Sequence, residues 1–170
     1  RLRRKPLSQA VRSIRARRLG FERERGAVAV EAEEGLCFVR VPLETAERHE
    51  AAALGVLRPL AERGLCIRFL RIFPGCLSFL AAGEDLPAAR AALVDAGVPV
   101  EASVGCAVVT VFAPNMRSIP GLMARMGEAL YARAIDVYQT ADSHSSVSCV
   151  VAAEQLADAI DAVRGEFGLT

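Results

Sequence analysis

The sequence is poor in the residues that build metal sites and disulfide frameworks. It has two histidines and no tryptophan, and its five cysteines are widely spaced, with no C-x-x-C pair. An odd number of scattered cysteines fits no disulfide framework, and a structural metal centre needs clustered Cys and His ligands. We therefore expect reduced thiols, a cytoplasmic protein, and neither a metal nor a cofactor.

Long apolar runs are also missing. No stretch approaches the roughly 18 residues that a membrane-spanning helix needs, and no apolar signal segment follows the charged N-terminus. Lys5 is the only lysine, and no glycine-rich phosphate-binding motif carries a lysine. We therefore expect no membrane association, no export and no catalytic residues in this chain.

What the sequence does have is apolar residues and an uneven distribution of charge. The 170 residues are 52% hydrophobic, which is enough to fill a core, and the net charge is +1. Residues 1–25 carry ten basic and two acidic side chains. We interpret them as a solvated basic arm or linker; nucleic-acid binding is the alternative, but no aromatic residues are interleaved with the basic ones. The chain begins at Arg1 rather than Met, so we expect a piece of a longer product.

An internal repeat organises the rest. A shift of seventy residues places 60–67 on 130–137 and 77–80 on 147–150 without gaps, and the pattern of apolar positions is kept. The first copy predicts strands at 36–41, 65–72, 76–81 and 98–104, with helices at 51–63 and 84–96. The second copy predicts strands at 106–112, 134–140 and 145–151, with helices at 119–132 and 153–167. This order is the ferredoxin-like βαββαβ motif, an α+β fold.

The second copy lacks a fourth strand, because the chain stops directly after its last helix. The unassigned segment 26–31 alternates like a strand with one buried face. We predict that it completes the second sheet, so that the first unit is inserted into the second. The expected domains are a basic arm (1–25), an N-terminal unit (33–104), and a C-terminal unit made of 26–32 plus 105–170.

Two segments of the second copy resemble the C-terminal regulatory region of aspartate kinases, a tandem of ACT domains. That family has V-G-x-G-M-x-x-x-P-G-V before a helix, and residues 112–122 read F-A-P-N-M-R-S-I-P-G-L. Its G-I-x-I strand and S-A-D-S-H segment are similar to A-I-D-V-Y-Q-T-A-D-S-H at 134–144. The Met, Pro and Gly of the first motif align, whereas both glycines of V-G-x-G are replaced.

The resemblance implies a regulatory role. ACT pairs bind a free amino acid where two domains pack side by side, and occupancy controls a kinase domain that phosphorylates L-aspartate with ATP. The effectors implied are lysine, diaminopimelate or threonine. The implied partners are a second copy of the chain, giving a homodimer, and an aspartate kinase catalytic domain or subunit.

The residue types support an effector site in the second copy. The loop at Asn115, Met116, Arg117, Ser118 and Ile119 leads into a helix, whose N-terminus attracts a carboxylate. Asp136 stands where the family commonly has Asn, and it could accept a hydrogen bond from an ammonium group; a solvated surface carboxylate is the alternative.

The first copy fits this role less well. Glu50 replaces the Pro of the second copy, and Arg68 stands where many family members have Asp, which reverses the sign of the contact. Either this unit takes a different effector, or it serves only in packing.

A hydrolase triad is suggested by Asp142, Ser143 and His144. Neighbours in an extended chain point to opposite faces, so the three cannot converge on one site. We expect a turn held by its own hydrogen bonds.

The leading hypothesis is thus a regulatory amino-acid-binding module of an aspartate kinase. The alternatives are a free-standing ACT protein that senses or dimerises without the kinase, and a module that binds nucleic acid through its basic arm.

Overall fold

The computed structural model describes residues 26–43, 49–114 and 119–169, so the basic arm lies outside the described residues. The strands are β1 (Ala29–Pro42), β2 (Arg68–Phe73), β3 (Cys76–Ala82), β4 (Glu101–Phe112), β5 (Val137–Asp142) and β6 (Ser146–Ala152). The helices are α2 (His49–Glu62), α3 (Leu86–Asp95), α4 (Leu122–Tyr131) and α5 (Leu156–Phe167), and 3₁₀ turns at Gly83–Asp85 and Ala153–Gln155 precede α3 and α5. No helix in these described ranges is long and apolar enough to cross a bilayer.

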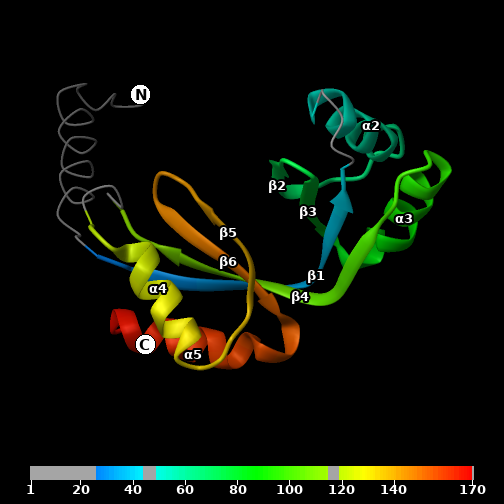
Figure 1. The fold of residues 1–170 in the computed structure, drawn as a ribbon. Helices are drawn as coiled ribbons and strands as arrows, with labels where there is room; N and C mark the ends of the chain where they lie inside the picture. The colour runs from blue at the N-terminus through cyan, green and yellow to red at the C-terminus, as the bar shows by residue number, and fades with distance from the viewer. Residues whose placement is uncertain (1–25, 44–48, 115–118, 170) are drawn as a thin grey trace, which may run out of the picture.

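The strands form one six-stranded antiparallel sheet in the order β2-β3-β1-β4-β6-β5 (Figure 1). The N-terminal unit supplies β2, β3, α2 and α3, and the C-terminal unit supplies β5, β6, α4 and α5. The two central strands, β1 and β4, run through both units. The predicted fold class, two ferredoxin-like units with the first inserted into the second, is confirmed.

The central strands differ from the prediction, which divided each of them into two separate strands. Residues 29–33 of β1 pair with 108–112 of β4, and residues 36–42 of β1 pair with β3. The register shifts between Glu33 and Leu36 and again between Leu36 and Cys37. Gly35 (φ 72°) and Gly105 (φ 76°) lie at these shifts in the left-handed region, as glycines at β-bulges do. A bulge bends a strand without breaking it, so the two expected sheets are continuous, and the exact domain bounds stay a prediction.

The repeat extends to the way the first helix of each unit ends. Gly64 (φ 68°) follows α2, and Ala134 (φ 54°) lies at the matching position after α4. In both units the N–H of the next residue donates to the carbonyl five residues back, at 3.1 Å. This is the hydrogen bond that closes a Schellman motif, which needs a left-handed residue.

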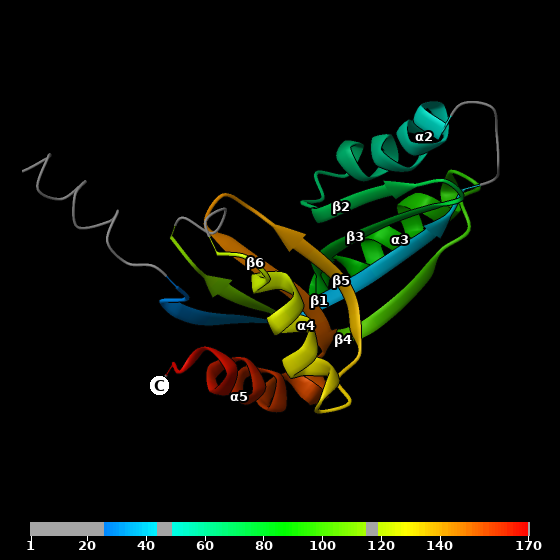
Figure 2. The same ribbon diagram turned by 60° about the vertical axis from the view of Figure 1, so that its left-hand side comes forward.

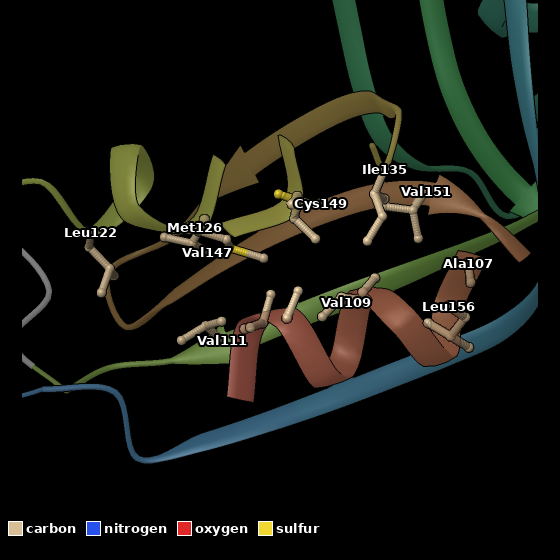
Figure 3. Close-up of a cluster of buried hydrophobic side chains, with 14 of the residues drawn as sticks. Ala107, Val109, Val111, Leu122, Met126, Ile135, Val147, Cys149, Val151 and Leu156 are labelled. Atoms are coloured by element: carbon tan, nitrogen blue, oxygen red, sulfur yellow. The ribbon is translucent and has the colours of Figure 1, made fainter. Parts of the chain in front are cut away.

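Each unit buries its own core between the sheet and its helices. In the C-terminal unit, alternate residues of β4 and β6 such as Val109 and Val151 pack against Met126 of α4 and Leu156 of α5 (Figure 3). The N-terminal core likewise joins β1 and β3 to α2 and α3 and includes Phe79. The apolar periodicity of strands and helices therefore places the helices on one face of the sheet.

A third core lies on the opposite face of the sheet, which we call the inner face. It consists of Leu36, Phe38, Leu80, Cys106, Val108 and Val150, with Phe69 packed against it. These residues alternate along the strands with those of the two helix-facing cores. The sheet is bent, so that β2 and β3 face β5 and β6 across the inner face (Figures 1 and 2). Apolar burial thus joins the two units to each other as well as to their helices.

Candidate functional site

The predicted effector loop is described only at its ends. Asn115, Met116, Arg117 and Ser118 lie outside the described residues. Ile119 is half-buried and packs against the C-terminal core. In the structure Ile119 therefore serves as a packing residue at the end of the loop.

Helix α4 begins at Leu122, three residues later than predicted. Gly121, its N-cap, has φ 76° and ψ 8°, a left-handed conformation that no residue of a right-handed helix adopts. Pro120 therefore precedes the helix instead of lying in its first turn. Gly121 has no side chain with which to cap α4, and the first N–H groups of a helix have no acceptor within it. This end of α4 has the backbone donors and the dipole that favour an anion.

Asp136 lies immediately before β5 and is exposed. Its backbone N–H donates to Oε1 of Gln155 at 3.4 Å, and Nε2 of Gln155 donates to the carbonyl of Ala134 at 3.1 Å. The Gln155 amide therefore fixes the backbone on both sides of Ile135. Among the described residues the Asp136 carboxylate makes no hydrogen bond or ion pair, so it is free to accept a donor from a ligand.

Within one chain Asp136 and Phe112, the last residue of β4 before the loop, lie at opposite ends of the strands. Val137 pairs with Val151, which pairs with Ala107, whereas Asp142 pairs with Val147, which pairs with Val111 beside the loop. The five residue steps along β5 correspond to about 17 Å. A single small amino acid cannot touch both Asp136 and the end of β4 at Phe112 in one unit.

In the N-terminal unit the arginine that replaces the family's Asp is already paired. Nη1 of Arg68 lies 2.7 Å from Oε2 of Glu33, and both side chains are about half exposed. The repeat counterpart of Asp136 is Cys66, which is exposed. This unit therefore has no carboxylate at either position where an effector ammonium would need one.

The segment with the residue types of a triad is a turn. Oγ of Ser143 accepts hydrogen bonds from the N–H groups of Ser145 and Ser146 at 3.2 and 3.1 Å. The Ser143 N–H donates to the Ser146 carbonyl at 2.8 Å. The prediction of a self-bonded turn between β5 and β6 is confirmed.

Two of the buried thiols, Cys37 and Cys149, are poor nucleophiles. Burial raises the pKa of Cys149 from 9.0 to about 11. Burial also raises the pKa of Cys37, although a hydrogen bond with the Ala81 backbone opposes the rise. Because the thiolate is the reactive form, neither residue supports covalent chemistry.

Sequence reasoning missed a cavity of about 660 Å³ on the inner face. Its lining includes Arg40 of β1, Arg71 of β2, Ser78 of β3 and Glu101 of β4, together with Tyr138 of β5. The signal was the presence of polar residues at alternate positions of otherwise apolar strands. The sequence pattern alone does not say which of these polar residues lie together; that becomes clear only when the strands of both units are paired.

The sequence of the C-terminal unit matches a known domain family. Residues 109–167 match the family model of the ACT domain. The chain is 26% identical over 115 residues to aspartokinase 1 of Bacillus subtilis (strain 168), an alignment that covers 68% of this chain. It spans only 28% of the length of that relative.

Solved structures share the fold over most of the chain. The structure of aspartokinase alpha and beta subunits superposes with a TM-score of 0.78 at 15% identity, covering 85% of this chain and 100% of the other. The ligand-free regulatory subunit of aspartate kinase from Thermus thermophilus gives a TM-score of 0.75 at 20% identity, covering 84% and 99%. At these identities the likeness shows the fold. The C-terminal unit thus matches the ACT domain family, the chain has the fold of aspartokinase regulatory subunits, and the resemblance predicted from its sequence is confirmed.

Proposed function

We propose that this chain is the regulatory module of a cytoplasmic aspartate kinase. It binds lysine, diaminopimelate or threonine and thereby controls the phosphorylation of L-aspartate by ATP. The observation that carries the proposal is the inserted pair of units, which superposes on nearly the whole of a regulatory subunit. No cofactor is needed for this role, since the amino acid itself carries the signal.

The separation of Asp136 from the loop favours an effector site formed by two copies of the chain. Strands related by a two-fold axis perpendicular to them run antiparallel when their units pack side by side. That arrangement brings the start of β5 in one copy next to the loop end of the other. The effector carboxylate would then meet the N-terminus of α4 in one protomer, and its ammonium would meet Asp136 of the partner.

The N-terminal unit has a different part in this proposal. Arg68 has only hydrogen-bond donors, so it cannot accept from an ammonium group, and it engages the neighbouring Glu33 carboxylate in an ion pair. We assign effector binding to the C-terminal unit and packing to the N-terminal unit. The same ion pair favours the second candidate function, a free-standing ACT protein that dimerises or senses without the kinase.

Control of a kinase requires two arrangements of the module that bind the effector with different affinity. An effector held between two copies meets this requirement, because it stabilises the arrangement in which both halves of its site touch it. The kinase catalytic domain or subunit would respond to that arrangement through its contacts with the module.

The test is calorimetric titration of the full chain with L-lysine, meso-diaminopimelate and L-threonine, with light scattering to determine the oligomeric state. We expect one of the three to bind saturably to a dimer. A dimer that binds none of the three would support the free-standing alternative. A salt-dependent shift of DNA or RNA on a gel, without amino-acid binding, would favour the basic-arm alternative.

A further inference from the structure

Four polar residues form one row across the inner face. Arg71 of β2 pairs with Ser78 of β3, Ser78 pairs with Arg40 of β1, and Arg40 pairs with Glu101 of β4. Neighbouring strands are about 4.8 Å apart, so the row spans about 14 Å. On β1 and β3 it alternates with residues of the N-terminal core, and all four residues line the cavity.

The floor of the cavity has its hydrogen bonds satisfied. Oγ of Ser78 donates to Oε1 of Gln139 at 2.9 Å, and Nε2 of Gln139 donates to the carbonyl of Phe69. Both polar side chains are buried. Because each of these side chains already has a partner, the floor fixes the shape of the cavity and leaves recognition to the charged side chains around it.

The charged side chains at the rim of the cavity can still form hydrogen bonds with a ligand. Nη2 of Arg71 donates to the carbonyl of Thr140, which leaves its remaining N–H groups available. Among the described residues, neither Arg40 nor Glu101 makes a side-chain hydrogen bond or ion pair. A guanidinium has five N–H donors and binds carboxylates in a planar, bidentate manner.

One wall is apolar and comes from both units. The rings of Phe38 and Tyr138 are stacked, with centroids 5.9 Å apart and planes inclined by 17°. The cavity volume, about 660 Å³, lies within the range of small-molecule sites. It therefore combines one apolar side with a few converging charges, as ligand sites do.

We propose that this cavity binds an acidic α-amino acid, L-aspartate or L-glutamate. The two arginines and one glutamate give it a net charge of +1, and an acidic amino acid carries two carboxylates and one ammonium. The order of groups also fits: Glu101 takes the ammonium, Arg40 the α-carboxylate and Arg71 the side-chain carboxylate. A basic amino acid would place its second ammonium beside Arg71, which opposes binding.

This site lies within one chain, whereas the site under Proposed function needs two. A ligand here would contact β2, β3, β1 and β4 and would lie against Tyr138 of β5, so it would hold the two units together. The two proposals can therefore be confirmed or refuted independently of each other.

The test is calorimetric titration of the full chain with L-aspartate, L-glutamate, succinate and L-lysine. We expect saturable binding of an acidic amino acid at one per chain, with succinate weaker because it has no ammonium. Arg40→Gln and Arg71→Gln should each weaken this binding about tenfold or more, the size of a lost charged hydrogen bond. Glu101→Gln should weaken binding of the acidic amino acid by a similar factor, while succinate should bind with unchanged or higher affinity.

Matched controls are Arg90→Gln and Glu128→Gln, which remove the same charges from exposed positions on α3 and α4. Both should bind the acidic amino acid like the parent chain, and circular dichroism should show every variant folded. The proposal is overturned if no acidic ligand binds, if binding survives both arginine substitutions, or if succinate binds as tightly as aspartate. Lysine binding that the three cavity variants leave unchanged would instead be assigned to the site between copies.

Discussion

Ala134 adopts the left-handed backbone conformation of Gly64, its counterpart seventy residues earlier. Both residues end the first helix of their unit, with φ 54° and 68°, and the residue after each donates an equivalent hydrogen bond of 3.1 Å. Only one of them is glycine, so the duplicated unit keeps its geometry where the residue type no longer favours it. An alanine in this conformation costs roughly 1–2 kcal/mol.

Ala134→Gly should therefore stabilise the chain. Removing the Cβ relieves the strain, and the greater freedom of glycine in the unfolded chain offsets part of the gain, leaving roughly 0.5–1 kcal/mol. Urea unfolding measures the difference. The matched control is Gly127→Ala in the middle of α4, where no atom lies within 4 Å of an added Cβ. That change replaces glycine by alanine in a helix and should also stabilise, by about 1 kcal/mol. A loss of stability in Ala134→Gly would contradict the account.

Leu60 and Leu130 occupy matching positions in the two helix-facing cores, with 1% and 0% of their surface exposed. Replacing either one by Ala should cost about 2–5 kcal/mol, because it removes buried methyl groups and leaves a cavity. The control Leu54→Ala, at a residue 57% exposed, should cost far less. Since β1 and β4 belong to both units, we expect one unfolding transition that both variants shift. Two resolved transitions, each moved by only one variant, would show that the units unfold independently.

Burial of Cys149 should make stability depend on alkaline pH. Its pKa is about 11 in the folded chain against an ordinary value of 9.0, so between these values the unfolded chain loses the thiol proton more readily. The buried thiol therefore contributes about 2–3 kcal/mol to the free energy of unfolding. This contribution is complete below pH 9 and is lost as pH rises toward 11. We expect Cys149→Ala to reduce this alkaline loss, and Cys66→Ala, at an exposed thiol, to leave it unchanged. Equal pH dependence in the parent and in Cys149→Ala would refute the assignment.

The fold was largely predictable because the repeat and the apolar periodicities agree. The seventy-residue shift identified two units, and the missing last strand predicted that residues 26–31 join the second of them. Residues 29–33 pair with β4, which supports that logic. A bulge at Gly35 or Gly105 could not be predicted, because a left-handed glycine ends a strand as readily as it bends one. The start of α4 was misplaced because Pro120 and Gly121 resemble a first helical turn until the φ of Gly121 is known.

The candidate site was less predictable. Asp136 and the loop were grouped by motif, but motif spacing does not say which end of a sheet a residue occupies; the strand register does. The inner-face cavity depends largely on pairings between segments thirty or more residues apart, such as Arg40 with Ser78. Local pattern contains no information on such contacts, so only the assembled sheet brought these residues together.

The most direct test of the central claim compares effector binding by the full chain with binding by Asp136→Ala, and uses Asp161→Ala on the exposed side of α5 as the matched control. The account predicts that lysine, diaminopimelate or threonine binds to the parent and to the control alike. It also predicts that binding weakens by about tenfold or more in Asp136→Ala, because the ammonium loses its charged acceptor. Binding of equal strength in all three proteins, or of none of these amino acids to any of them, would contradict it.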